Sequence, residues 1–357
     1  MFKRFFCFFV LIAIAFISIG CAPTKSPDKE FVGESISYVS LGDSIPEGYG
    51  LPDYANKSED GFVSGNYTNS LNSFLKDKYR NVSKHNYAQT GLTSTQLKEQ
   101  LISLSGNSLS QTQEEMKSDI ETANIITVCI GANDILAPAQ NNFVNILLEE
   151  DISPYLLQFD SGLSTFNMNF PIIVSTLREL NPTAKLVFSN IYNPYAAFSL
   201  SESNIEIYYS ILKIYDIPAD KVNLVGQIGE AYIDADIVYN SNSEPIKTVE
   251  IGLNQIIQSV LNEAENCYLL DVKSCFDAYL RDNNSYDIVN STVLNHNKIS
   301  FNLSDPFNME KNLIEIQEQI VPYIDPHPSV LGHNQIKGIL IQEVSEILNL
   351  NKSNQTA

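Results

Sequence analysis

A serine that follows a short apolar segment is the first residue whose type and position could support nucleophilic chemistry. The segment reads Tyr38-Val-Ser-Leu-Gly-Asp-Ser44, and Gly42 lets the chain turn sharply where an apolar strand would end. In a parallel sheet that position is the rim where ligands bind, and the Ser44 hydroxyl would be exposed there. The Gly-Asp-Ser triplet alone is weak evidence, because all three residue types are common in turns. Ser44 therefore predicts an enzyme only if the rest of the chain supplies its partners.

Three further segments supply the groups that a nucleophilic serine needs. Gly91 follows the second apolar run and can offer an unhindered backbone N–H, whereas Asn133 follows the third run and can offer a carboxamide. Such donors stabilise the negative oxygen that develops during acyl transfer. Near the C-terminus, His327 stands in the sequence Asp-Pro-His-Pro and can act as the general base that a serine of ordinary pKa requires.

The other polar residues near these segments are interpreted as structural. Asp43, beside the serine, suits a hydrogen bond to the loop backbone, and Asp134, beside the asparagine, is interpreted in the same way. His333 falls on the last expected helix and is interpreted as a packing residue or as a residue that supports the site from behind. His85 and His296 are interpreted as surface or incidental residues.

The elements that must position these groups are short apolar runs that alternate with helical patterns. Buried strands are expected at Ile36–Leu41, Val82–Ala88, Ile125–Ile130, Leu186–Ile191 and Tyr268–Val272. Helices are expected at Tyr67–Lys78, Ser94–Leu104, Phe166–Leu180, Val249–Glu263 and Val330–Leu348. This alternation favours a parallel sheet covered on both faces. Ser44, Gly91 and Asn133 would then lie at one edge of the sheet, where the strands end.

Two segments interrupt the alternation and are interpreted as insertions over the sheet edge. Residues 194–245 are rich in Tyr, Asp and Asn, and a helix is expected near Asn204–Tyr215, followed by an acidic loop. Residues 283–322 contain several Asn and Ser residues. Either insertion could shape substrate access, or both could be surface elaboration without a catalytic part.

The four segments, in this order, resemble the SGNH hydrolases, also called GDSL esterases and lipases. The resemblance runs from about residue 35 to residue 348 and implies a flavodoxin-like three-layer α/β/α sandwich with a parallel central sheet. It implies Ser44 as the nucleophile and His327 as the base. It also implies an oxyanion hole formed by the N–H groups of Ser44 and Gly91 and the side chain of Asn133. No metal or organic cofactor is implied.

The acid that would orient the histidine departs from the family pattern. Members of the family usually carry this acid three residues before the histidine, where this chain has Ile324. A carboxylate lies two residues before it, at Asp325, and Pro326 could turn the loop so that the carboxylate reaches Nδ1 of His327. Asp325 is the favoured catalytic acid, and a backbone carbonyl that orients the histidine is the alternative.

The N-terminal segment is typical of an export signal. Lys3 and Arg4 precede an apolar run that extends from Phe5 to Ile19. The following Ser-Ile-Gly-Cys21 resembles the box that ends bacterial lipoprotein signals, except that serine stands where leucine is usual. The resemblance implies that Cys21 becomes the lipidated N-terminus.

The domain organisation follows from this interpretation. Residues 1–20 are the expected signal peptide, residues 21–34 a polar tether and residues 35–350 the hydrolase domain. The protein is then expected to be exported and anchored to the outer face of a bacterial cell membrane through Cys21. An uncleaved membrane anchor is the alternative, and it also places the domain outside the cytoplasm.

Charge and cysteine content exclude some classes of partner. Acidic residues outnumber basic ones by 42 to 22, which gives a formal net charge of −20, so a nucleic-acid partner is not expected. Cys267 and Cys275 are eight residues apart and could form a disulfide, which would leave Cys129 unpaired. No CxxC pair or histidine cluster has the spacing of metal ligands, so no metal site is predicted.

The predicted function is hydrolysis of carboxylic esters through an acyl-enzyme on Ser44. Lipid esters such as lysophospholipids, or short-chain acyl esters, are favoured as substrates, because the tether would hold the enzyme at a membrane. An O-acetyl esterase acting on polysaccharides is the alternative, and the acidic surface disfavours anionic polymers. A non-catalytic binding lipoprotein is the third hypothesis, but it would not explain why all four segments are present.

Overall fold

The computed structural model describes residues 31–137, 146, 149–196, 219–240, 242–290 and 325–350 of the chain. At its centre lies a five-stranded sheet in the order β2-β1-β3-β4-β7, with every neighbouring pair parallel. The strands are β1 (Gly33–Gly42), β2 (Tyr79–Asn86), β3 (Ile125–Cys129), β4 (Lys185–Ser189) and β7 (Cys267–Leu270). Counted along the chain, this order is 2-1-3-4-5, the flavodoxin-like arrangement. The predicted fold class is confirmed.

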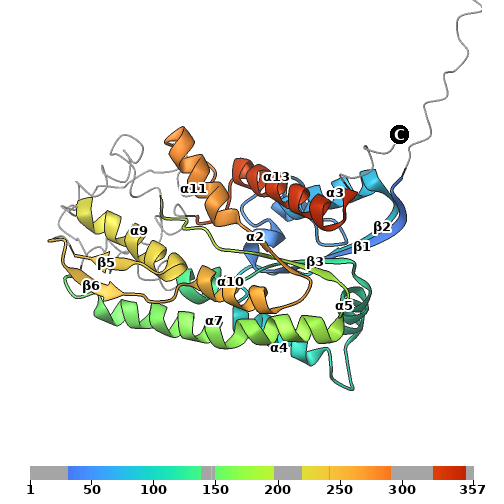
Figure 1. The fold of residues 1–357 in the computed structure, drawn as a ribbon, viewed down its shortest axis with the longest axis horizontal. Coiled ribbons are helices and arrows are strands. Elements are labelled where there is room, and N and C mark those ends of the chain that lie inside the picture. Colours follow the sequence, from blue (N-terminus) through green and yellow to red (C-terminus); the bar gives the residue numbers. More distant parts are fainter. Residues whose placement is uncertain are drawn as a thin grey trace, which may run out of the picture.

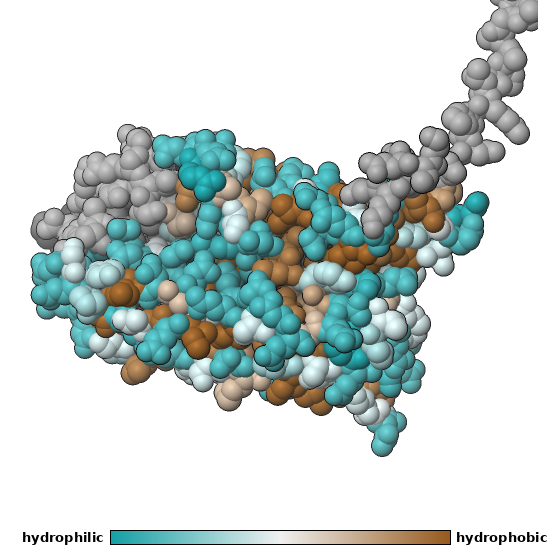
Figure 2. Space-filling view, viewed as in Figure 1, coloured by the Kyte–Doolittle hydropathy of each residue, from teal (hydrophilic) through white to brown (hydrophobic). Residues whose placement is uncertain are grey.

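Helices cover both faces of the sheet (Figure 1). One layer contains α3 (Tyr67–Lys78), α11 (Val272–Asn283) and α13 (Val330–Ile347). The other contains α4 (Ser94–Ser103), α5 (Gln111–Thr122), α7 (Ser153–Leu180) and α10 (Leu253–Glu263). Two short helices, α2 (Ser44–Glu47) and η1 (Tyr54–Asn56), follow β1. On the face drawn in Figure 2, hydrophilic side chains cover most of the helices and apolar side chains show between them.

The register of the strands explains how distant segments meet. Ser40 of β1 pairs with Asn86 of β2, and Gly42 pairs with Cys129 of β3. The β3 side chains are buried throughout, as expected for a central parallel strand covered on both faces. Because β1, β2 and β3 end side by side, the turns that follow them share one edge of the sheet.

Most predicted elements agree with the structure, but several helices begin elsewhere. The predicted helix at Tyr67–Lys78 has the observed bounds, whereas α7 begins at Ser153 and not at Phe166. Helix α10 begins at Leu253 and not at Val249, because Gly252 is its N-cap residue. Helix α5 was not expected, because it buries only Met116 and Ile120 and therefore lacks a clear apolar stripe.

The acidic loop expected in the first insertion is wrong for its described part. Residues 219–248 form α9 (Ala219–Asp234) and an antiparallel pair of strands, β5 (Ile237–Tyr239) and β6 (Pro245–Thr248). Leu224, Val225 and Ile228 are buried at helical spacing, and this burial stabilises α9 despite its polar neighbours. The helix expected near Asn204–Tyr215 lies outside the described residues.

A buried lysine ties α9 to α11. The Lys273 ammonium lies 2.9 Å from Glu230 Oε1 and 3.1 Å from Asp234 Oδ2, both on α9. It also lies 2.5 Å from Asp277 Oδ2, one turn further along α11. Burial alone would lower the pKa of Lys273, but hydrogen bonds and charge from Asp277 and Glu230 outweigh burial and raise it. This ion cluster attaches part of the first insertion to the sheet domain.

The described part of the second insertion belongs to the core and is not surface elaboration. Tyr286, Ile288 and Val289 are each at most 1 % exposed. Val289 forms an antiparallel bridge to Pro328, and Ile288 accepts a backbone hydrogen bond of 2.8 Å from Ser329. Residues 291–324 lie outside the described part of the chain.

Other boundary and cysteine predictions meet the structure in part. Strand β1 begins at Gly33, two residues before the expected start of the domain. Cys129, Cys267 and Cys275 are free thiols, so the disulfide considered for the last two is absent.

Within the described ranges, no helix combines the length and apolarity that crossing a bilayer requires. Those same ranges hold no group of three or more His, Cys, Asp or Glu side chains arranged to bind a metal ion.

Candidate active site

The turn after β1 holds Ser44 at the first position of helix α2. Gly42 has φ +128°, and a Cβ there would lie 1.9 Å from the Cys129 carbonyl oxygen, so only glycine fits. Asp43 caps α2 by accepting a 3.0 Å hydrogen bond from the Ile45 N–H, which agrees with its predicted structural role. Burial raises the pKa of Asp43 to about 7. Ser44 itself is 5 % exposed.

The structure brings Ser44, His327 and Asp325 together in one hydrogen-bonded series. Ser44 Oγ lies 2.6 Å from His327 Nε2, although the two residues are 283 positions apart in the chain. On the other side of the ring, Nδ1 contacts Oδ1 of Asp325. The same carboxylate oxygen accepts the backbone N–H of His327 at 3.0 Å. In this arrangement a histidine can remove the serine proton while a carboxylate holds its ring.

The electrostatic environment keeps Asp325 ionised. Burial alone would raise the pKa of Asp325, but the hydrogen bonds and charge of His327, with a further hydrogen bond from Asn290, outweigh burial and lower it. A carboxylate that stays negative at neutral pH can stabilise an imidazolium formed beside it.

Two residues that the sequence did not single out hold the histidine loop. Asn290 Nδ2 donates to Asp325 Oδ2 at 3.0 Å, and the Asn290 backbone N–H donates to the His327 carbonyl oxygen at 2.9 Å. The Tyr192 hydroxyl, beyond the end of β4, donates to the Pro326 carbonyl oxygen at 2.5 Å. No local signal identifies either residue, because both act across contacts between distant segments.

A glycine six residues after Ser44 leaves room for these contacts. Gly50 has φ +83°, and a Cβ there would lie 3.0 Å from both Asp325 Oδ2 and Asn290 Nδ2. Next to it, Tyr49 places its ring centroid 4.8 Å from that of His327, and Tyr49 remains 40 % exposed. Tyr49 and Gly50, which follow the serine closely in the chain, therefore form one side of the histidine site.

Asn133 and Gly91 stand differently with respect to the serine. Asn133 lines the same cavity as Ser44, and its Nδ2 donates to the Leu92 carbonyl oxygen at 2.9 Å. Gly91 precedes Leu92 in an exposed turn with φ +79° and is not among the residues that line that cavity. Asn133 and Ser44 thus share one cavity, and Gly91 lies outside its lining.

The turn that carries Asn133 is anchored by its neighbour. Asp134 accepts hydrogen bonds from the Ser94 N–H at 2.9 Å and from the Ser94 hydroxyl at 2.6 Å, at the start of α4. The structural role predicted for Asp134 agrees with these contacts. These hydrogen bonds therefore fix the turn after β3 to the start of α4 at the edge of the sheet.

The cavity beside the serine is small and largely apolar, with a volume of about 30 Å³. Its polar groups are those of Ser44, Asn133 and His327. The rest of the lining is aliphatic apart from the ring of Tyr192, and it consists of Ile45, Ala132, Leu136, Ala137, Ile191, Tyr192, Pro194 and Pro326.

The other described histidines, His333 and His85, are not members of the hydrogen-bonded series at Ser44. His333 is 1 % exposed and stacks on Tyr67 with ring centroids 5.8 Å apart, as expected for a packing residue. Burial lowers the pKa of His333 to about 3. His85 is partly exposed, with Nδ1 2.7 Å from Asp119 Oδ2. His296 lies outside the described residues.

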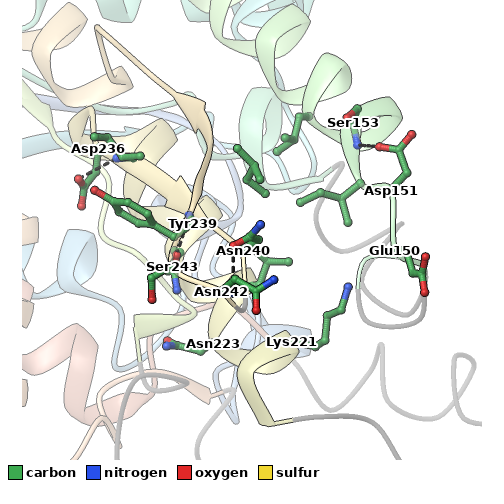
Figure 3. A pocket seen from close by; sticks show the side chains of 16 residues that line it. Glu150, Asp151, Ser153, Lys221, Asn223, Asp236, Tyr239, Asn240, Asn242 and Ser243 are labelled. Atoms are coloured by element: carbon green, nitrogen blue, oxygen red, sulfur yellow. Dashed lines mark hydrogen bonds between the residues drawn. The ribbon is translucent and has the colours of Figure 1, made fainter.

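A larger cavity of about 990 Å³ lies between the start of α7, helix α9 and the β5–β6 pair. Figure 3 shows Glu150, Asp151 and Ser153 on one side of it, with Tyr239 and Asn240 across from them. None of the sixteen residues in Figure 3 is a histidine or cysteine, and none lines the cavity at Ser44. This second cavity therefore contains no serine–histidine pair among its lining residues.

A serine, a histidine and an aspartate that meet at the carboxyl edge of a parallel sheet form an arrangement typical of serine hydrolases. The sequence profile of the GDSL-like lipase/acylhydrolase family matches residues 40–290. The chain belongs to this family, and it is accordingly assigned to the ester hydrolases. The family predicted from the four segments is confirmed.

One curated relative shares part of the chain. The uncharacterized protein YpmR of Bacillus subtilis (strain 168) is 30% identical over 171 residues, which are 48% of this chain and 56% of the relative. The match thus spans little more than half of the relative's length.

Several solved structures are similar at low identity. A phospholipase A1 from Streptomyces albidoflavus has 10% identity, covers 86% of this chain and 98% of its own, and gives a TM-score of 0.48. An extracellular lipase from Streptomyces rimosus has 11% identity, covers 87% of this chain and 99% of its own, and gives a TM-score of 0.49. An acetylxylan esterase from Geobacillus stearothermophilus has 13% identity, covers 88% of this chain and 96% of its own, and gives a TM-score of 0.42. Family membership rests on the sequence match and not on these scores.

Proposed function

We propose that this protein is a serine esterase that hydrolyses carboxylic esters through an acyl-enzyme on Ser44. The observation that carries the proposal is the series from Asp325 through His327 to Ser44, with 2.6 Å between Ser44 Oγ and His327 Nε2. A serine hydroxyl at its ordinary pKa is a weak nucleophile, and an adjacent base within hydrogen-bond reach activates it.

The proposed reaction has two halves. Ser44 Oγ attacks the ester carbonyl carbon while His327 Nε2 takes its proton, and the Asp325 carboxylate stabilises the imidazolium. The bond from the carbonyl carbon to the alcohol oxygen then breaks as His327 gives the proton to that oxygen. Water attacks the acyl-enzyme by the same route, which releases the carboxylic acid and restores the serine.

The oxyanion donors are proposed to come from the three turns at the sheet edge. As the first residue of α2, Ser44 has a backbone N–H without an intrahelical acceptor. Asn133 uses one carboxamide N–H on Leu92 and retains the other for substrate. Gly91 is the third proposed donor, because its turn adjoins the carbonyl that Asn133 contacts. One such donor is commonly worth about 10²- to 10³-fold in turnover.

The test is a comparison of purified full-length protein with its Ser44→Ala variant on p-nitrophenyl acetate. Turnover is expected to fall by about 10³-fold or more, because the nucleophile is lost. Ser73→Ala, which removes an exposed hydroxyl on α3, is the matched control and should retain wild-type turnover. Equal rates for wild type and Ser44→Ala would refute the proposal.

We also propose that the enzyme is exported and held at the outer face of a bacterial membrane through lipid on Cys21. The support is the sequence of residues 1–21, in which two basic residues, an apolar run and a lipobox-like end follow one another. Its substrates would then be small-molecule or lipid esters met outside the cytoplasm, and nucleic acid is not proposed as a partner.

A further inference from the structure

We infer that the acyl site beside Ser44 accepts only short acyl groups, so that the substrates are acetyl or propionyl esters. This inference rests on the proposed serine-esterase function and specifies its substrate class. Among the substrates expected from the sequence, it favours short-chain esters over esters of long fatty acids.

The size of the cavity sets the limit. The space beside Ser44 measures about 30 Å³. In the same measure a single water molecule needs roughly 10–15 Å³, so the cavity has room for about two waters. Pockets that enclose larger ligands measure roughly 300–1,000 Å³. An acyl group of two or three carbon atoms matches the available space, whereas a chain of eight carbon atoms would extend beyond it.

The chemistry of the walls fits the hydrocarbon part of an acyl group. Ile45, Leu136 and Ile191 line the cavity, and each is at most 7 % exposed. A charged or strongly polar acyl group would lose its hydration here without gaining a partner from these side chains. The wall residues therefore favour a small uncharged acyl group.

The wall at the end of β4 is fixed by hydrogen bonds, so it does not retreat easily. The Ile191 N–H donates to Asn254 Oδ1 at 2.8 Å, and Asn254 Nδ2 donates back to the Ile191 carbonyl oxygen at 2.9 Å. The next residue, Tyr192, is held by its hydroxyl on Pro326 and by its ring, whose centroid lies 4.6 Å from that of Phe276. Moving this wall would leave buried polar groups unpaired.

The turn that carries Ala132 and Asn133 is also constrained. It follows Gly131, which has φ +119° and where a Cβ would lie 2.6 Å from a ring carbon of Phe166. Asp134 anchors the same turn to α4 through Ser94. Both turns that line the cavity are thus held by contacts outside it.

The alcohol side of the ester is not confined in this way. His327 must protonate the leaving oxygen, so the alcohol leaves on the histidine side of the serine. There Tyr49 covers the His327 ring and is itself 40 % exposed. Tyr49 is not among the residues that line the cavity, so an alcohol group on this side of His327 would lie outside the cavity.

The experiment measures kcat/KM of the full-length protein for p-nitrophenyl acetate, butyrate and octanoate, each beside the Ser44→Ala variant. We expect hydrolysis that depends on Ser44, with kcat/KM for acetate at least about 100-fold above that for octanoate. Ser44-dependent hydrolysis of octanoate at the rate of acetate or faster would overturn the size limit and leave the esterase function standing. Absence of Ser44-dependent hydrolysis of all three esters would overturn both.

Variants of the fixed wall give an independent readout. Ile191→Ala enlarges the cavity and should raise the ratio of butyrate to acetate kcat/KM by at least about 10-fold. Ile191→Val, which removes less volume and perturbs folding less, should raise it by a smaller factor. Ile251→Ala removes an isoleucine that is 59 % exposed, so it is the matched control and should leave the ratio unchanged. An unchanged ratio in folded Ile191→Ala would contradict the assignment of this wall to the acyl site.

Discussion

At the residue scale, the loop from Asp325 to His327 folds back on itself. One carboxylate oxygen of Asp325 contacts both Nδ1 and the backbone N–H of His327. Its other oxygen accepts a hydrogen bond from Asn290. An acid two residues before the histidine, and not three, therefore reaches the ring, and the carbonyl of the intervening Pro326 accepts a hydrogen bond from the Tyr192 hydroxyl.

Asp325→Asn should lower kcat by about 10²- to 10⁴-fold with little change in KM. The asparagine amide can donate to Nδ1, which would hold the imidazole in the wrong tautomer, and its neutral side chain cannot stabilise an imidazolium. Steady-state kinetics on p-nitrophenyl acetate would measure this effect. A loss below about 3-fold would favour the alternative in which a backbone carbonyl orients the histidine.

Asn290→Ala should lower kcat by about 10-fold while KM for the same ester stays close to that of wild type. The variant removes the donor that holds Asp325 Oδ2, yet the backbone hydrogen bond from residue 290 to His327 is retained. Asn283→Ala is the control, since the Asn283 side chain donates only to the Tyr279 carbonyl at the end of α11. Similar kinetics for the two variants would show that Asn290 does not position the acid.

At the element scale, the contact between α3 and α13 includes a buried neutral histidine. His333 stacks on Tyr67, and neither of its ring nitrogens has a hydrogen-bond partner among the described residues. Because burial lowers the pKa of His333 to about 3, the folded protein does not bind a proton there at moderately acidic pH. In the unfolded chain, His333 binds a proton below its ordinary pKa of 6.5.

His333→Phe should therefore reduce the acid sensitivity of folding. Stability contributed by neutral His333 is present above pH 6.5 and is lost as the pH falls toward 3, because protons bind preferentially to the unfolded chain. At pH 5 this loss amounts to at most about 2 kcal/mol. Urea unfolding at pH 5 and pH 8 should show a smaller difference in unfolding free energy for the variant than for wild type. An equal difference in both proteins would argue against the buried neutral histidine.

The ion cluster between α9 and α11 makes a second prediction at this scale. Lys273→Met should lower the unfolding free energy by about 3–5 kcal/mol, because three carboxylates would lose their shared partner in a partly buried site. Lys117→Met removes an exposed ion pair with Glu121 on α5 and should cost less than about 0.5 kcal/mol. Urea unfolding of both variants gives the comparison, and equal costs would contradict the importance of the cluster.

At the scale of the whole molecule, the acidic domain and the N-terminal segment have separate roles. A net charge of −20 disfavours attraction to anionic surfaces, so attachment to a membrane would depend on lipid and not on the surface of the domain. Lipid on the terminal cysteine, rather than electrostatics, is therefore the proposed anchor.

Cys21→Ser should release the protein from the membrane fraction of a bacterial host into the soluble fraction without changing its esterase activity per molecule. The lipid, and with it the apolar anchor, would be absent. Fractionation with immunodetection, together with labelling by a clickable fatty acid, measures both consequences. A variant that stays in the membrane fraction would favour the uncleaved anchor.

Local patterns in the sequence specify the alternation of strands and helices and identify the candidate serine and histidine. Burial follows local periodicity, so β3 and α3 could be predicted from neighbouring residues alone. Helix α5 was missed because it buries only Met116 and Ile120, and the β5–β6 pair was missed because its strands are only three and four residues long.

The contacts between groups at the site depend on long-range packing, which local patterns do not specify. The serine and histidine are 283 positions apart, Tyr192 and Pro326 are 134 apart, and Asn290 and Asp325 are 35 apart. Hydrogen bonds over such separations depend on how the sheet edge and the histidine loop pack, and no local pattern encodes that packing. The volume beside Ser44 depends on the same packing, because residues from several distant turns enclose it.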